Sequence, residues 1–167
     1  GLRRPIASVG DALKLLGVSN IINVINSLSI RSSLVETAWV DMTSFWDNAV
    51  DVASSCAAWA GLLNIAPQDE AYTLGLFHNV GIPLLMERFN HYPEVVKMAY
   101  NDPKSRITET ENGAIDCNHA VVGYYVAKSW KLPMYLCEAI ADHHKTELFF
   151  IDELPGDSRK KHLLVVL

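Results

Sequence analysis

Histidines are the residues of this sequence best suited to chemistry. Four of the six lie within or at the ends of apolar helical segments: His78, His119, His143 and His144. Imidazole nitrogens and carboxylates are the usual protein ligands for zinc, iron, manganese and nickel. A phosphohydrolase with two metal ions also needs a bridging carboxylate, because that charge helps to turn bound water into hydroxide near neutral pH.

The residue that follows His78 bears directly on that chemistry. The segment "GLFHNVG" places Asn79 where an aspartate would complete a metal-bridging pair. An amide is neutral, and its carbonyl oxygen is a weak bridge between two cations. Each histidine also has a structural interpretation: His78 can donate to a backbone carbonyl, and His143 and His144 can interact with a helix C-terminus without any metal.

Other candidate groups have simpler explanations. Glu138 and Asp142 are four residues apart, which could form an acid pair but is more typical of a solvated helix face. Four aromatic residues are more typical of a core than of a ligand platform: Trp46, Trp59, Phe77 and Trp130.

The composition indicates one globular domain of 167 residues, half of them apolar. A net charge of −5 without a basic stripe argues against nucleic-acid binding. The apolar runs are too short to cross a bilayer, and Arg3 and Arg4 lead into no signal peptide, so we expect a cytoplasmic protein without membrane contacts. The three cysteines are scattered and odd in number, which predicts reduced thiols: Cys56, Cys117 and Cys137.

Helical periodicity runs through almost the whole chain, and no alternating strand pattern of useful length is present. The sequence therefore predicts an all-α domain. The expected helices span residues 8–17, residues 19–28, about 41–63, 67–78, 108–130 and 133–144, with further starts after Gly81 and at Pro93.

Two of these helices are expected to form the central pair of the bundle. The helix at 41–63 carries an apolar stripe that includes Cys56 and Trp59, and Thr108 with Glu111 forms a capping-box pattern at the start of the other. The tail "SRKKHLLVVL" begins like an amphipathic helix and stops in mid-pattern, which indicates truncation. Five residues on apolar stripes are expected to be largely buried: Trp59, Leu76, Val122, Trp130 and Ile140.

Four segments, in order, resemble the signatures of the HDOD domain, the output-domain relative of HD phosphohydrolases in bacterial signalling proteins. They are "GDALKLLG", "FWDNAVDVA", "AYTLGLFHNVGIPLL" and "NHAVVGYYVAKSWKLPMYLCEAIADHH". The resemblance is strongest over residues 5–145. It implies that residues 1–167 form a single HDOD-like domain with an HD-domain-like helical bundle, truncated at both ends.

The resemblance also implies a degraded metal site. The first metal histidine of active HD enzymes would fall near Asn48, and their His-Asp pair on His78 and Asn79. The later histidines of the related cyclic-di-GMP phosphodiesterases are similar to His119, His143 and His144, and a closing aspartate would lie beyond Leu167. We therefore expect no catalytic residue and no metal cofactor, and at most a single transition-metal ion. The residues that could hold such an ion are His78, His119 and His143.

The function implied is that of a non-catalytic regulatory or output domain in bacterial signal transduction. Its expected partners are signalling proteins or domains of the receiver and diguanylate cyclase type, or a nucleotide ligand. The alternative is a residual metal-dependent phosphohydrolase or phosphodiesterase of the HD superfamily. A ligand sensor would have a concave pocket with a basic rim near the histidines, whereas an interaction module would expose an apolar patch elsewhere.

Overall fold

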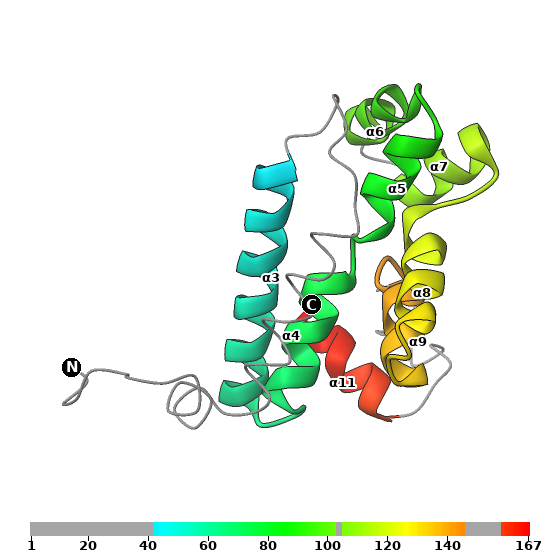
Figure 1. Ribbon diagram of the computed structural model, residues 1–167. Helices are drawn as coiled ribbons and strands as arrows, with labels where there is room; N and C mark the ends of the chain where they lie inside the picture. Colours follow the sequence, from blue (N-terminus) through cyan, green and yellow to red (C-terminus); the bar gives the residue numbers. More distant parts are fainter. Residues whose placement is uncertain (1–41, 103–104, 146–157) are drawn as a thin grey trace, which may run out of the picture. The chain divides into compact units, whose positions relative to one another are not determined.

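The structure, a computed structural model, describes residues 42–102, 105–145 and 158–167 (Figure 1). Every described residue belongs to one compact unit. These residues form helices and loops with no strand, which confirms the all-α prediction. Within the described ranges, no helix has the length and apolarity needed to cross a membrane. The helices expected at 8–17 and 19–28 lie outside the described residues.

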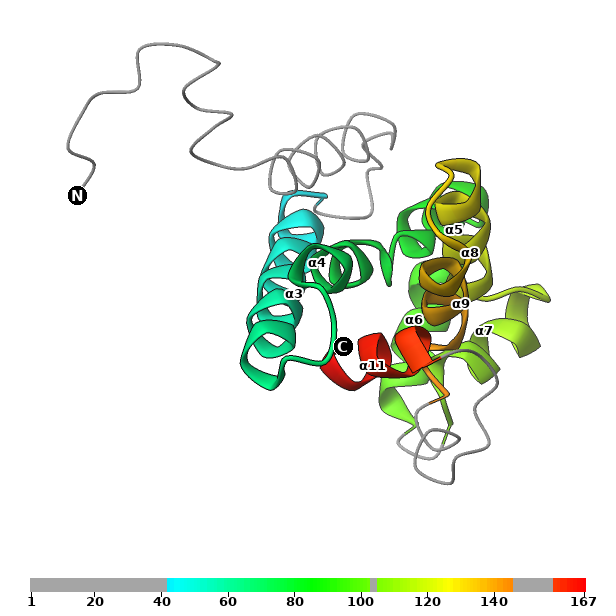
Figure 2. The same cartoon turned by 90° about the horizontal axis from the view of Figure 1, so that it is seen from below.

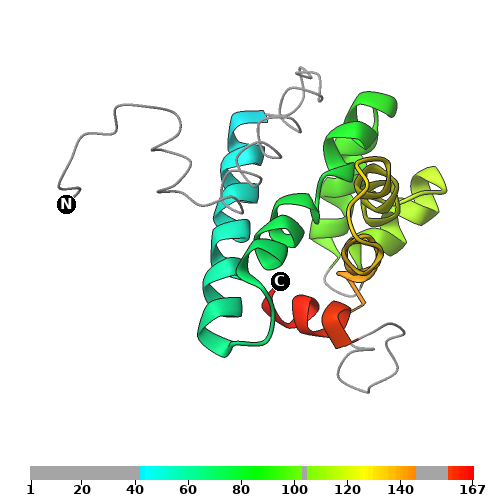
Figure 3. The same cartoon turned by 60° about the horizontal axis from the view of Figure 1, so that its bottom comes forward.

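Helix α3 (Met42–Leu63) packs most extensively against α4 (Gln68–Phe77), and the two lie side by side in Figures 1 and 3. The helices cross closely at Gly75, where an added Cβ would lie 2.6 Å from the Cα of Ala53. Because glycine has no side chain, α4 can approach the backbone of α3 at this point. The predicted helix at 41–63 is confirmed, but its partner is α4 and not the segment at 108–130.

The buried face of α3 differs from the expected one. Trp59 is 55% exposed, so the prediction that it belongs to the core is wrong. The buried stripe is rotated by about one residue and brings small side chains to the contact with α4, which permits the close crossing. Its members are Trp46, Ala49, Ala53, Cys56 and Ala60.

Five shorter helices follow α4 and complete most of the bundle. They are α5 (Gly81–Arg88), α6 (Tyr92–Asn101), α7 (Ile107–Ile115), α8 (His119–Ser129) and α9 (Met134–Asp142). Helix α8 packs against α9 and α5, and α6 packs against α7. Phe77 at the end of α4 meets Trp130 edge to face, with ring centroids 5.9 Å apart. Leu76 and Ile140 are fully buried as expected, whereas Val122 and Trp130 are only partly buried.

The single helix expected at 108–130 is two helices in the structure. Asp116 has a left-handed backbone (φ 55°) that ends α7, and Asn118 caps α8 by accepting a hydrogen bond from the Val121 N–H at 3.0 Å. The expected capping box is also wrong. Helix α7 begins after Arg106 without a side-chain cap, and the Glu111 carboxylate is buried in other contacts.

The predicted tail helix is confirmed as α11 (Ser158–Val166), which contacts α9, α3 and α4. Figures 2 and 3 show it in red, running beside α9 toward α3. Leu163 and Lys160 are buried in this contact, and Lys160 donates to the Asp142 carboxylate at the end of α9 with an N–O distance of 2.5 Å. A buried cation therefore anchors α11 beside the last turn of α9.

Candidate functional site

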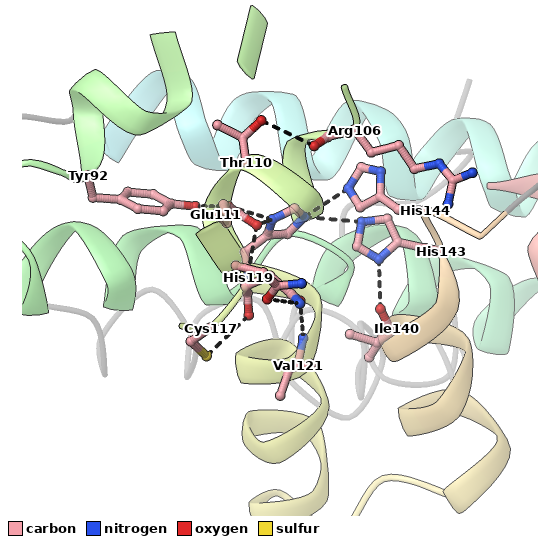
Figure 4. Close-up of polar contacts among 12 residues, drawn as sticks. Tyr92, Arg106, Thr110, Glu111, Cys117, His119, Val121, Ile140, His143 and His144 are labelled. Carbon is pink, nitrogen blue, oxygen red and sulfur yellow. Dashed lines mark hydrogen bonds and ion pairs between the residues drawn. The ribbon is translucent and has the colours of Figure 1, made fainter. Parts of the chain in front are cut away.

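Three histidine rings converge where the start of α8 meets the end of α9 (Figure 4). The Nε2 atom of His119 lies 2.9 Å from Nε2 of His144 and 3.4 Å from Nε2 of His143. One ligand atom from each ring lies within 4.8 Å of the others. We call His119, His143 and His144 the histidine cluster. A short loop joins α8 and α9, and their side-by-side packing brings residues 24 and 25 positions apart into contact.

The ring of His119 is oriented by a buried carboxylate. The two carboxylate oxygens of Glu111 lie 2.9 Å and 2.8 Å from His119 Nδ1, and one of them also accepts the His119 backbone N–H. The Tyr92 hydroxyl donates to the other oxygen. All three residues are completely buried. Since the carboxylate accepts the Nδ1 proton, the Nε2 lone pair of His119 faces the other two histidines.

Backbone carbonyls orient two further rings in the same manner. Nδ1 of His143 lies 2.7 Å from the Ile140 carbonyl, and Nδ1 of His78 lies 2.7 Å from the Gly75 carbonyl. A carbonyl can only accept, so each Nδ1 carries the proton and each Nε2 keeps its lone pair. Metal-ligating histidines are usually held in this manner, with the second ring nitrogen donating to a carboxylate or a carbonyl.

Three of these rings are also kept neutral: His78, His143 and His144. Burial lowers the pKa of His143 well below its ordinary value, and the neighbouring His144 lowers it further. Burial and the nearby His119 lower the pKa of His144 to about 4, and burial lowers the pKa of His78. A metal ion binds the neutral form of imidazole. At neutral pH these rings are already in that form, so none of them has to lose a proton before it can bind an ion.

The six predicted site residues fall into two groups. His119, His143 and His144 form the cluster, whereas Asn48, His78 and Asn79 line a separate cavity of about 220 Å³. Within the part of the chain that the structure describes, its other lining residues are uncharged: Phe45, Ala49, Val52, Ile82 and Tyr100. The groups meet where the His78 ring lies edge to face against His143, with centroids 5.5 Å apart.

A second cavity, of about 320 Å³, opens beside His144. Its walls come from the start of α7, the start of α8 and the end of α9, and two of its side chains, Arg106 and Lys145, are cationic. The remaining lining residues are Thr108, Glu109, Asn112, Asn118, Val121 and Ala141. The structure thus has a concave pocket with basic residues next to the histidines. It also has exposed apolar side chains at the end of α3: Trp59, Leu62 and Leu63.

Asp142, considered above as half of an acid pair with Glu138, is paired with two lysines. Its Oδ1 accepts from Lys145 Nζ at 2.8 Å, and its Oδ2 accepts from Lys160 Nζ at 2.5 Å. Burial alone would raise the pKa of the Asp142 carboxyl, but the hydrogen bonds from both lysines outweigh burial and hold the pKa below its usual value. Asp142 therefore stays ionised and connects α11 with the rim of the larger cavity.

Sequence reasoning missed Glu111 and Tyr92 as parts of the site. Glu111 fitted a capping box, and Tyr92 carried no motif. One signal was available: Ile107 and Ile115 lie four residues on either side of Glu111, so this carboxylate occupies an apolar helix face. A carboxylate on such a face needs buried partners, which here are His119 and Tyr92.

The family model for the HDOD domain matches residues 1–146. Two crystal structures have the same HD-like helical bundle at low sequence identity. A protein named as a putative phosphohydrolase, from Shewanella amazonensis, has a TM-score of 0.80 at 21% identity, over 96% of this chain and 57% of its own. An HDOD domain protein with unknown function, from Geobacter sulfurreducens, has a TM-score of 0.75 at 22% identity, over 98% of this chain and 54% of its own. The chain thus spans little more than half the length of these structures. No curated protein matches it.

Proposed function

Since this chain belongs to the HDOD family, we propose that it is a non-catalytic regulatory domain of a bacterial, cytoplasmic signalling protein. It acts by binding a small ligand or other signalling domains, such as receiver or diguanylate cyclase modules, and not by hydrolysing a phosphodiester. Nucleic acids and membranes are not among its proposed partners. The family supports a signalling role, and the chemistry of the site supports binding without hydrolysis.

The donor set around the histidine cluster is the observation that carries this proposal. The carboxylate in contact with the cluster, Glu111, has both oxygens engaged behind the His119 ring by His119 itself and by Tyr92. On the other side of the site, Asn48 and Asn79 offer neutral amides. A centre with two metal ions needs a carboxylate that bridges them, and these side chains do not supply one.

A single transition-metal ion does fit the cluster. His119, His143 and His144 would hold it through neutral imidazoles, two of them oriented by partners of their Nδ1 atoms. Such an ion, when bound, supplies a Lewis acid with room for a further ligand. This set differs from the expected His78, His119 and His143, because the end of α9 places both of its histidines beside His119.

One observation favours the alternative, a residual HD-type phosphohydrolase. The Glu111–His119 pair has the arrangement in which a carboxylate supports a metal-binding histidine. A similar structure also carries the name of a putative phosphohydrolase. The proposal and the alternative differ in one measurable property, which is turnover of a phosphodiester.

Metal content and hydrolysis together test the proposal. The protein is purified without chelator or metal-affinity tag, its metals are quantified, and bis(p-nitrophenyl) phosphate and cyclic dinucleotides are offered with manganese, iron or nickel. We expect at most one ion per chain and no turnover. The matched variants are His119→Ala in the cluster and His91→Ala on the exposed surface. Turnover that is lost in the first variant and kept in the second would overturn the proposal.

A further inference from the structure

We propose that the larger cavity beside His144 binds a small phosphorylated anion. We call it the anion pocket and define it by Arg106, Thr108, Asn112, Asn118, His144 and Lys145. This inference rests on the proposed regulatory function, because it names the class of ligand that such a domain would bind. A volume of about 320 Å³ is in the range of pockets that hold small metabolites.

The charge of the pocket selects for anions. Among the described lining residues, two are cations, Arg106 and Lys145, and one is an acid, Glu109, so these residues contribute a net positive charge in a chain whose net charge is −5. The smaller cavity around His78 is lined, among the described residues, by uncharged side chains. Arg106 and Lys145 therefore favour an anion in the larger cavity by electrostatic attraction.

Neutral groups add hydrogen-bond donors to the cations. The amide of Asn118 is fixed at both ends: its oxygen accepts from the Val121 N–H, and its nitrogen donates to the Asn112 side-chain oxygen at 2.9 Å. Asn112 uses its oxygen in this bond and so retains its NH₂ group as a donor. A guanidinium, an ammonium, an amide NH₂ and the Thr108 hydroxyl together match the several acceptor oxygens of a phosphate group.

Lys145 can turn to a ligand at low cost, and the pair between Arg106 and Glu109 is a weak surface contact. Arg106 and Glu109 are paired at 3.9 Å on the exposed surface, where such pairs contribute little. Lys145 donates to Asp142, but Asp142 also has the buried Lys160 as a counterion. When Lys145 moves to a phosphate oxygen, the Asp142 carboxylate remains paired. The interaction with Lys160 thus makes the charge of Lys145 available to the pocket.

His144 places the pocket next to the histidine cluster. Its ring lines the pocket while its Nε2 faces His119 at 2.9 Å, and Figure 4 shows the Arg106 side chain beside the same ring. A ligand in the pocket therefore contacts a ring that belongs to the cluster. The remnant of the metal site would serve as one wall of a ligand site.

Calorimetric titration with defined probes tests this inference. The probes are pyrophosphate and adenosine monophosphate, with adenosine as the uncharged control, each with and without a metal chelator. We expect both phosphorylated probes to bind in chelator and adenosine not to bind. Arg106→Gln and Lys145→Gln should each raise the Kd about tenfold, as expected for one lost charge-assisted hydrogen bond. Lys97→Gln removes the same charge from the exposed face of α6 and should leave the Kd unchanged.

A variant with increased affinity guards against loss of binding through misfolding. Glu109→Gln removes an acid that lines the pocket and pairs with Arg106 at the exposed surface, so it should lower the Kd for pyrophosphate without disturbing the fold. The inference is overturned if neither phosphorylated probe binds in chelator, or if Lys145→Gln binds as tightly as the parent. If neither probe binds and the protein shows no turnover in the hydrolysis assay, only the anion pocket is refuted. Turnover in the hydrolysis assay would instead refute the non-catalytic role.

Discussion

The carboxylate of Glu111 contacts His119, eight residues further along the chain, and both side chains are completely buried. The Oε2–Nδ1 distance of 2.8 Å fixes the tautomer and the direction of the His119 ring. Glu111 lies behind the His119 ring, so it orients the Nε2 atom that a metal ion would bind without being a ligand itself.

Replacing Glu111 should therefore weaken any metal binding at the cluster. Glu111→Gln keeps the shape but removes the charge that makes the His119 ring a stronger donor, and we expect the affinity for Zn²⁺ or Co²⁺ to fall about 10- to 100-fold. The measurement is a titration against a competing chelator. Glu109→Gln, two residues away at the surface, is the matched control and should bind metal like the parent. Equal affinities in both variants would contradict this role.

Burial predicts opposite outcomes for two aromatic residues. Phe77→Ala removes a completely buried ring that packs against Trp130, and it should lower the free energy of unfolding by about 3–5 kcal/mol. Trp59→Ala changes a side chain that is 55% exposed, and it should lower that free energy by less than about 1 kcal/mol. Urea denaturation measures the free energy of unfolding of both variants. A larger decrease for Trp59→Ala than for Phe77→Ala would contradict the observed buried face of α3.

The lowered histidine pKa values predict a loss of stability in acid. For His144, the pKa in the folded protein, about 4, lies below the ordinary value of 6.5, so the unfolded chain binds the proton first as the pH falls. The contribution to stability is fully present above about pH 6.5 and is lost progressively toward pH 4. His143 and His78 shift in the same direction.

Denaturant unfolding in the presence of chelator, between pH 7.5 and pH 5, measures this effect. His143→Asn removes one titrating ring while its amide can still donate to the Ile140 carbonyl. Its free energy of unfolding should depend less steeply on pH than that of the parent. An unchanged slope would show that His143 does not titrate as its burial indicates.

Restoring one acid should not restore hydrolysis. Asn79→Asp places a carboxylate after His78, but Asn48 still lines the same cavity with a neutral amide, and the three cluster histidines do not line it. Groups that act as a unit give little when only one is repaired. We expect Asn79→Asp to bind one divalent ion more tightly than the parent and to show no turnover of cyclic dinucleotides. Turnover by this variant would contradict the view that several defects must be repaired together.

The sequence allowed the fold class to be predicted, but not which face of each helix is buried. Helix α3 is apolar on several sides, so a stripe through Trp59 and one through Ala60 both fit a helical period. Packing decides between them, because alanine at the crossing lets α4 approach, whereas a large ring would hold it away. That choice depends on a residue of α4, Gly75, and a periodicity within α3 cannot reveal it.

The positions of the cluster histidines were predictable, whereas their supporting partners were not. Apolar periodicity continues from α7 into α8 and hides the break between them. The residues at the break, Asp116 and Asn118, are of the types that favour a left-handed residue and a helix cap. If residues 108–130 formed one continuous helix, Glu111 and His119 would lie about 12 Å apart along its axis, so the sequence alone does not predict their contact.

The break at Asp116 also affects the order in which the site can form during folding. Closing a loop of eight residues between Glu111 and His119 costs little chain entropy and is fast, on the order of 10–100 ns for a loop of this length. His143 and His144 are 24 and 25 residues from His119, and their contacts require α9 to dock. The contact between α7 and the start of α8 can therefore orient the His119 ring early. When α9 docks later, His143 and His144 meet a His119 ring that is already oriented.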